Sequence, residues 1–479
     1  MMHRTIALFC GAMQLVTGSA AAQRPQVPAD TIHLSLQEAV TTGLRVADEI
    51  HLSVARADIA GAQVDFARAS MLPQLRLNSS YSRTFESARS NAVSAVFNQP
   101  NTYTVNANLS QSLFQGGRLY ATARAAGNLA EASRLDAEEQ RALFTIAVQR
   151  AYLAALLAER FVELQESNLQ LASGRLTQVQ QFHQAGRAAT YDVLRARVER
   201  ANIEPLTIEA RNERDITHLE IKRLLNIPLQ QPLALTTTID PVAAQAFVAA
   251  YIDSTTLPPP DRAALRAAEL VANSRRLAIT AARAEFLPTV TAFIQSGFQA
   301  FPPVGFGFPG QRGALNAASC PAGSDPGRIC QNGGWFEDRN LGVQFSWPVF
   351  DGLRARSALE LARAATRIAE LELRLEREQV AVEVARAHAE LRRAKAVFDA
   401  RGQNSTEATE AFRLASLRFS RGLSTQLEVS DAQLALLTAE GGQARATFDL
   451  YLATAELARA LGRPIPMPVT SRVARRTGT

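Results

Sequence analysis

The sequence predicts a mainly helical protein that also contains a few long β-strands and is built from two copies of one unit. Three observations support this fold class. Short motifs recur at a constant offset in the numbering, four segments alternate apolar and polar residues, and two very long stretches have helical periodicity. We therefore expect an internal duplication in which long helices alternate with pairs of strands.

The chain begins with the pattern of a secretory signal peptide. A short basic start is followed by an apolar stretch, 5–16, and by the small residues Ala20, Ala21 and Ala22. We predict that residues 1–22 are removed after export, and the alternative is a buried N-terminal helix. No later apolar run is long enough to cross a bilayer as a helix, so we expect no transmembrane helix, and any membrane would have to be crossed by strands.

The composition narrows the functions that are open to the chain. It has 479 residues and a formal net charge of +6, and only Lys222 and Lys395 are lysines, so the basic charge is mostly arginine at helical spacings. No basic run is interleaved with aromatic residues, so we expect no nucleic-acid partner. The histidines lie far apart and no catalytic motif is present, so we expect no metal, no cofactor and no enzymatic activity.

Two cysteines remain after the predicted signal peptide, Cys320 and Cys330. An even number of cysteines in an exported protein indicates a disulfide, so we predict that this pair is bonded. Both lie in a stretch rich in Gly and Pro, 301–337, which we predict to be a loop inserted in the second copy of the unit.

The duplication is clearest at a corner motif, in which Phe, a polar residue and Gly precede an Arg. The corner occurs twice, at Phe114 and Gly116 and again at Phe350 and Gly352, so the offset in sequence number is 236. Two predicted glycine turns, at Gly186 and Gly422, have the same offset. Leu-Pro pairs at 72–73 and 287–288 have an offset of only 215, so the second copy holds an insertion between its Leu-Pro pair and its corner.

These anchors divide the mature chain into four parts. The first repeat covers 23–227 and the second covers 261–463. The linker between them, 228–260, is rich in Pro, and residues 464–479 form a C-terminal tail.

Each repeat contains two predicted strands in which apolar and polar residues alternate. The four strands are predicted at 73–86, 102–114, 288–300 and 340–350. Their length suits a membrane crossing, but four strands cannot close a transmembrane barrel, and an open edge is not viable in lipid. If they cross a membrane, the chain must therefore oligomerise, and a dimer would supply 8 strands and a trimer 12. The alternative is a small soluble β-layer with one polar face.

Long helices are predicted on both sides of each glycine turn. A helix before the first strand of each repeat ends at the Leu-Pro pair, and the four longer helices are predicted at 118–183, 190–226, 353–419 and 426–461. Two apolar seams run side by side along 118–183, which indicates a helical neighbour on each side. A ring of helices meets that requirement, although an ordinary long bundle is also compatible with the periodicity.

Taken together, the order of these features resembles the TolC-type outer-membrane efflux protein family. The resemblance covers about 31–463 and depends on the duplicated strand pairs, corners and glycine turns behind a signal peptide. It implies a homotrimer with a 12-strand outer-membrane β-barrel that continues as a long periplasmic α-helical barrel. It also implies a passive exit duct of a tripartite efflux or type I secretion system, which receives small molecules or proteins from an inner-membrane transporter through a periplasmic adaptor.

The resemblance implies roles for both ends of the helices. The corner residues named above would mark the passage from the barrel to the helices, and 301–337 would be an extracellular loop. The linker, 228–260, would form a belt around the tunnel together with C-terminal residues. The turns at Gly186 and Gly422 would form the periplasmic tip, where the adaptor docks.

Three acidic residues and one aromatic residue near this tip match family positions. Glu428 and Asp431 match an acidic pair that rings the closed aperture, and the alternative is that they complement the dipoles of their helices. Asp192 matches a residue that pairs with a tyrosine across the tip, but the corresponding position here is Phe419, which has no hydroxyl. We therefore expect a different restraint to hold this tip closed.

A function of another class is also compatible with the residues. The chain would then be a secreted or periplasmic helical interaction protein whose strands form a soluble layer. Only a duct should stay in the outer membrane after a carbonate wash, so membrane fractionation separates the two functions.

Overall fold

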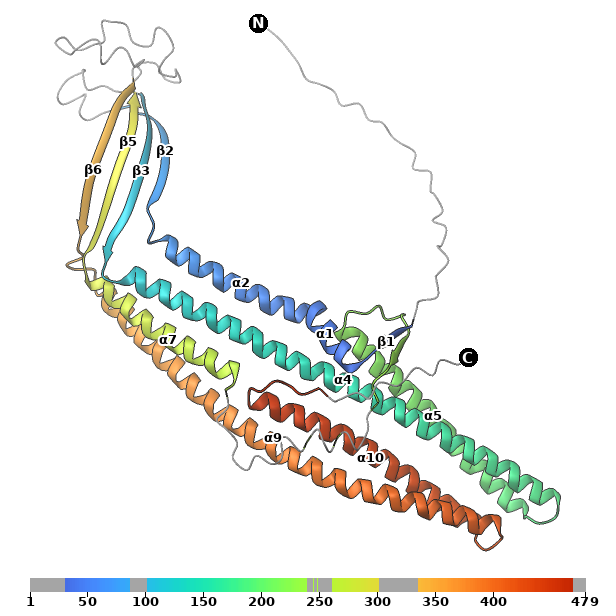
Figure 1. Cartoon of the computed structure of the whole chain (residues 1–479). Coiled ribbons are helices and arrows are strands. Elements are labelled where there is room, and N and C mark those ends of the chain that lie inside the picture. The colour runs from blue at the N-terminus through green and yellow to red at the C-terminus, as the bar shows by residue number, and fades with distance from the viewer. Residues whose placement is uncertain are drawn as a thin grey trace, which may run out of the picture.

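The computed structural model describes residues 31–86, 101–238, 244, 248, 261–300 and 335–467. A four-stranded sheet stands at one end of a long helical body, and two helical hairpins end at the opposite end (Figure 1). The predicted disulfide and most of the predicted loop 301–337 lie outside the described residues.

The helical body consists of two sets of helices, one from each repeat. The helices of the first repeat are α1 Leu36–Val46, α2 Asp48–Ala69, α4 Arg118–Gln184 and α5 Thr190–Leu224. Those of the second repeat are α7 Ala263–Arg283, α9 Arg354–Ser420 and α10 Gln426–Ala460. Helices α4 and α9 have 67 residues each, which corresponds to about 100 Å. The two long hairpins lie side by side, with α4 in contact with α10.

The helical stretch before the first strand differs from the prediction because it is two helices rather than one. Ala47 has an extended backbone, with φ −72° and ψ 130°, and it caps the end of α1 and the start of α2. Asp48 and Glu49 follow in the first turn of α2, where acidic side chains interact favourably with the helix dipole.

All four strands of the sheet are antiparallel. In sheet order they are β2 Gln74–Arg83, β3 Asn101–Gln115, β5 Thr289–Ala300 and β6 Trp335–Ser346. One cross-strand row on the first face is apolar: Leu75, Leu109, Ile294 and Leu341. The adjacent row on the second face is polar: Arg76, Asn108, Gln295 and Asn340. In the single chain no described element covers the apolar face, and Leu75 and Leu341 are 71% and 79% exposed.

The fourth strand begins and ends earlier than predicted. It covers Trp335–Ser346 instead of 340–350, so the predicted loop 301–337 was too long and the predicted strand too short at its start. The strand ends before Pro348, which has no backbone N–H for a ladder hydrogen bond. The indole Nε1 of Trp347 instead donates to the carbonyl oxygen of Phe286 at 3.2 Å. The other three strands lie within their predicted ranges or extend them by a single position.

Near the middle of α4, the chain's first described strand and the linker are fixed by a buried tyrosine. Strand β1, Ile32–Leu34, pairs in parallel with β4, Leu233–Leu235. The Tyr152 hydroxyl donates to the carbonyl oxygen of Leu34 at 2.7 Å and accepts from the amide of Thr237 at 3.2 Å. Burial raises the pKa of Tyr152, so this hydroxyl stays protonated. One phenol therefore satisfies two buried backbone groups.

A second buried cluster joins four helices close to the start of α7. Arg262 bonds to Glu139 at 2.8 Å and also to Glu383, while Arg459 lies 3.3 Å from each of these two glutamates. Burial opposes the charge of Glu383, but hydrogen bonds from Gln379 and Arg262 outweigh it and keep its pKa below the ordinary value. Two positive and two negative charges thus compensate one another where α4, α7, α9 and α10 meet.

Replacing Tyr152 with Phe should destabilise the middle of the molecule. The change leaves a buried carbonyl and a buried amide without their partner, which costs about 1–3 kcal/mol. We expect a lower thermal midpoint in detergent and faster proteolysis near β4. Tyr120→Phe is the matched control, because Tyr120 lies on the same helix and is exposed. Equal midpoints for the two variants would contradict this role.

Candidate functional site

The two hairpin tips at the lower end of Figure 1 have the same turn geometry. Gly186 and Gly422 have φ of +69° and +72°, a backbone conformation that favours glycine. The amides of Gly186 and Arg187 donate to the carbonyls of His183 and Phe182 at 3.0 and 2.7 Å. The amides after α9 repeat this pattern at Gly422, so both turns end their first helix with a Schellman motif.

Two of the three predicted tip acids act as helix caps. Glu428 and the Thr425 hydroxyl form a capping box, in which the Glu428 carboxylate accepts from the Thr425 amide at 3.4 Å. Asp192 occupies the equivalent position and accepts from the amide of Ala189 at 3.1 Å. The alternative given above for Glu428 and Asp431, that they stabilise a helix start, therefore describes Glu428, and Asp192 caps its own helix in the same way.

Asp431 and Phe419 behave differently from these caps. Asp431 lies one turn further along α10, is exposed, and has no ion-pair partner among the described residues. Phe419 is half-buried, and its carbonyl accepts from the amide of Gly422 at 2.9 Å. The Asp192 carboxylate is held by its own helix start, in keeping with the absence of a tyrosine at position 419.

A buried arginine above the tip was missed by the sequence reasoning. Arg175 on α4 is 9% exposed and donates to Glu199 on α5 at 2.9 Å. It also donates to Ser430 and Gln433 on α10, at 2.7 and 2.5 Å. Gln433 in turn donates to Asn168 on α4, so the network connects both hairpins.

A sequence signal for this network was available. Arg175 follows Ala172 and precedes Val179 on one apolar seam of α4, and all three residues are buried. An arginine at a seam position predicts a buried charge with partners on the next helix. Burial lowers the pKa of Arg175, and the charge and hydrogen bond of Glu199 oppose that effect. An arginine starts from such a high pKa that it remains charged here.

The corners between sheet and helices have tight glycine backbones. Gly116 and Gly352 have φ of +58° and +69°. A Cβ atom at Gly116 would lie 3.0 Å from the side chains of Ala284 and Leu287, so this corner packs closely against the end of α7. Phe114 is paired in β3, whereas Phe350 follows β6 and is highly exposed.

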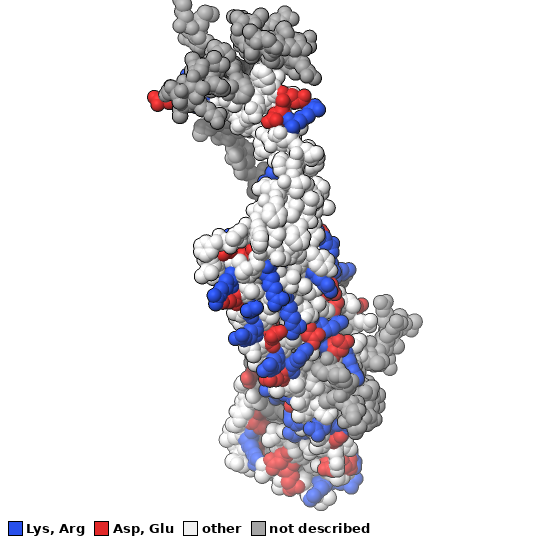
Figure 2. All heavy atoms as spheres, turned by 90° about the vertical axis from the view of Figure 1, so that its left-hand side faces the viewer, with Lys and Arg blue, Asp and Glu red and all other residues white. Residues whose placement is uncertain are grey.

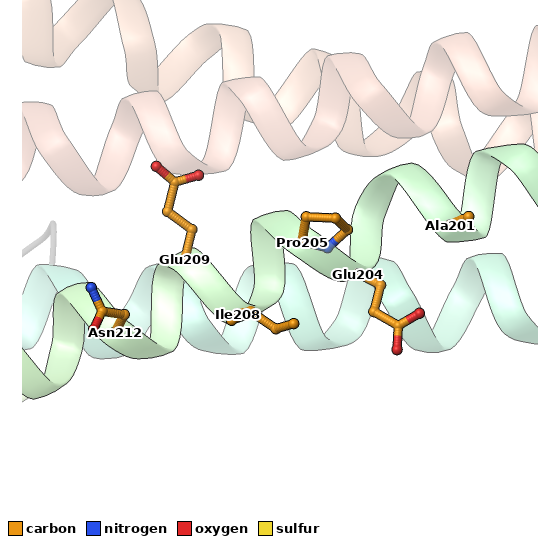
Figure 3. Close-up of a pocket in the computed structure, with 6 residues that line it drawn as sticks. All are labelled: Ala201, Glu204, Pro205, Ile208, Glu209 and Asn212. Atoms are coloured by element: carbon orange, nitrogen blue, oxygen red, sulfur yellow. The ribbon is translucent and has the colours of Figure 1, made fainter.

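The described residues offer no metal site, and the hollow drawn in Figure 3 is open to solvent. The six residues drawn in Figure 3 all belong to α5, and they border a shallow depression beside Pro205. Pro205 lacks the amide that would bond to Ala201 within the helix. Within the described ranges no group of three or more His, Cys, Asp or Glu side chains could hold a metal ion.

One helix is long and apolar enough to cross a membrane by length and composition, but packing accounts for its character. The helix is α4, and half of its most apolar window is buried within the protein. Its neighbours are α1, α2, α5, α7 and α10.

An uncovered apolar sheet of membrane height that continues into helices of about 100 Å defines a class of protein, the outer-membrane ducts. The family model of outer membrane efflux proteins matches residues 48–226 and 261–463. The chain therefore belongs to the outer membrane efflux protein family. It is an outer-membrane exit duct of efflux systems in Gram-negative bacteria and spans into the periplasm.

Similar proteins agree with this assignment. The pyoverdine export outer membrane protein OpmQ of Pseudomonas putida is 26% identical over 430 residues, which cover 86% of this chain and 83% of OpmQ. The solved outer membrane protein VceC of Vibrio cholerae has a TM-score of 0.68 and 20% identity, covering 90% of this chain and 97% of VceC. The solved CusC channel has a TM-score of 0.70 and 16% identity, covering 93% and 96%. The predicted fold class is confirmed.

Replacing Arg175 with Met should loosen the contact between the two hairpins. Methionine keeps roughly the length of the side chain but removes every donor. The carboxylate of Glu199 and the side-chain oxygen of Gln433 then lose the arginine as a hydrogen-bond donor, which costs about 2 kcal/mol. We expect a higher single-channel conductance in planar bilayers, because α10 is less firmly held to α4. Arg413→Met is the control, since Arg413 pairs only with Glu410 on its own exposed helix face. Equal conductance of the Arg175 variant and the native protein would contradict this restraint.

Proposed function

We propose that the chain works as a homotrimer with a 12-strand barrel, formed by three copies of the four-stranded sheet. The trimer is a passive duct that receives cargo from an inner-membrane transporter through a periplasmic adaptor docked at the hairpin tips. The observation that carries the proposal is the pair of open sheet edges, β2 and β6, each of which has only one neighbour among the strands that the structure describes.

The surroundings of these edges support closure by further copies of the chain. A lipid-exposed sheet edge leaves backbone groups without hydrogen bonds, which is not viable in the hydrocarbon region. Closure of the sheet by β6 of one protomer and β2 of the next removes both edges. The apolar face that contains Leu75 and Leu341 would contact lipid in such a barrel. In the soluble β-layer considered above, the same face would be exposed to water.

The internal duplication supplies the register of this closure. Gln74 pairs with Ser110 in the first pair of strands, β2 and β3. Adding 215 to the first number and 236 to the second gives Thr289 and Ser346, which pair in β5 and β6. The same offsets can be applied where the two strand pairs meet, at β3 and β5, in which Leu109 pairs with Ile294. They place Phe345 opposite Ser79 of the next protomer.

This register is tested by intermolecular disulfides. In a chain with Cys320→Ser and Cys330→Ser, oxidation of the pair Phe345→Cys and Ser79→Cys should give covalent dimers and trimers, because directly opposed residues lie within disulfide reach. Phe345→Cys with Leu75→Cys is the control, displaced along the strand by about 13 Å. Denaturing electrophoresis measures the products. Only monomers from the first pair, or equal yields from both pairs, would refute the register.

A second prediction concerns the acidic aperture. Asp431→Asn should reduce cation preference in bilayer recordings more than Glu428→Gln, because both carboxylates are exposed but that of Glu428 is held at its helix start by the capping bond. Glutamine at position 428 retains the capping geometry, so it tests charge alone. Reversal potentials in a salt gradient measure the effect, and unchanged selectivity in both variants and in the double variant would refute the aperture.

The cargo of the duct is proposed to be a small molecule. The relative OpmQ is named for the export of pyoverdine, a small molecule, and this favours small-molecule efflux for the present chain. Protein secretion is the second candidate. A duct of this kind has no catalytic step, so selectivity depends mainly on the transporter and the adaptor that engage it.

A further inference from the structure

Four arginines lie where the helical body meets the sheet, one on each of the four helices that reach it. They are Arg68 on α2, Arg118 on α4, Arg283 on α7 and Arg354 on α9, and all four are exposed. Arg118 and Arg354 are related by the offset of the corners, and Arg68 and Arg283 by the offset of the Leu-Pro pairs. Each repeat therefore supplies two of these arginines, at equivalent positions.

Each of these arginines is four residues from an exposed apolar side chain at the end of the sheet. The four apolar residues are Leu72, Phe114, Leu287 and Phe350. Along 68–72 and 283–287, where a helix ends, four residues span about 6–8 Å. The segments 114–118 and 350–354 are instead turns that lead from the end of the sheet into a helix, so Arg118 and Arg354 lie at the start of that helix. The headgroup layer on one side of a bilayer is about 5–8 Å thick. If the apolar residues mark the edge of the hydrocarbon, the arginines lie at the depth of the phosphates.

The protein itself provides few anions at this level. Arg68 is 4.0 Å from Asp65, and Arg118 donates to the side-chain oxygen of Gln115 at 2.7 Å. For Arg118, Arg283 and Arg354 no carboxylate lies within 4.0 Å in the described parts of the chain. Two of these arginines do not stabilise their own helices. Arg118 and Arg354 are the first residues of α4 and α9, where the helix dipole disfavours a positive charge.

The distribution of charge over the surface agrees with this placement. Figure 2 shows a region over the strands that is nearly free of charged side chains, and directly below it Lys and Arg side chains gather together with a smaller number of Asp and Glu side chains. An apolar band that ends at a band of positive charge is the pattern expected at a membrane surface.

We propose that Arg68, Arg118, Arg283 and Arg354, the arginine collar, bind the phosphates of anionic phospholipids in the periplasmic leaflet. A guanidinium can donate two parallel hydrogen bonds to one phosphate, so each arginine can hold a headgroup directly. The proposal rests on the membrane placement of the sheet in the proposed function. It assigns the collar the role of fixing how deep the duct sits.

One tryptophan is well placed to report on these lipids. The chain has two, Trp335 and Trp347, so Trp335→Phe leaves Trp347 as the only reporter. The Trp347 indole donates to the carbonyl of Phe286, three residues from Arg283. The full-length Trp335→Phe protein is reconstituted into nanodiscs of phosphatidylcholine with one-fifth phosphatidylglycerol. Either lipid carries brominated acyl chains, and quenching per brominated lipid is compared.

We expect brominated phosphatidylglycerol to quench Trp347 at least about threefold more efficiently per lipid than brominated phosphatidylcholine, and the ratio should fall at high salt. Changing all four collar arginines to Gln should reduce the ratio to about one. The control changes four exposed arginines further along the helices to Gln: Arg134, Arg211, Arg377 and Arg413. It removes the same charge and should leave the ratio unchanged.

The outcomes separate the collar from the function on which it rests. Equal quenching of the Trp335→Phe protein by the two lipids overturns the collar and leaves the duct in the membrane. No quenching by either lipid overturns the membrane placement itself. If the Gln variant keeps its phosphatidylglycerol preference but changes the ion selectivity of the channel, the arginines face the tunnel and anionic cargo, and the collar is overturned.

Discussion

The pairing of backbone groups at the edges of the sheet is the constraint on which the rest of the structure depends. Strands β2 and β6 each offer one row of amides and carbonyls without a neighbouring strand in the described part of the single chain. In hydrocarbon such rows must be paired, so the sheet must close on itself through further copies. Closing the sheet into a barrel arranges the helices that leave it at the corners into a ring. The tunnel is thus a consequence of the strands' need for partners.

Much of this architecture could be predicted because it depends on patterns that recur. Alternation located three of the four strands to within a few residues, and the paired offsets of 236 and 215 reproduce the register of the second hairpin from that of the first. The strand at 340–350 was misplaced because Trp347 and Val349 continue the alternation past Pro348. A proline interrupts a ladder without altering the apolar pattern around it.

The candidate site was less predictable, since position in a motif does not determine what a side chain bonds to. Glu428 and Asp431 have the same charge and lie three residues apart, yet only Glu428 lies where it can reach back to an N-cap amide. Arg175 belongs to no motif, and its partners lie on α5 and on α10, far from it in the sequence. The partners in a buried ionic network of this kind depend on which helices lie side by side, and a single sequence gives little information about that.

The middle of the helical body and its tip are held together by different interactions. Around Tyr152 and the cluster of Arg262, apolar packing and paired buried charges join four helices and the linker. Towards the tip the described contact between the hairpins includes a polar network centred on one arginine, and the residues beyond it are largely exposed. Polar contacts at a partly hydrated surface can be exchanged for water at a small net free energy, whereas a dry core cannot. Of the two regions, the tip is therefore the one that can rearrange at the lower cost in free energy.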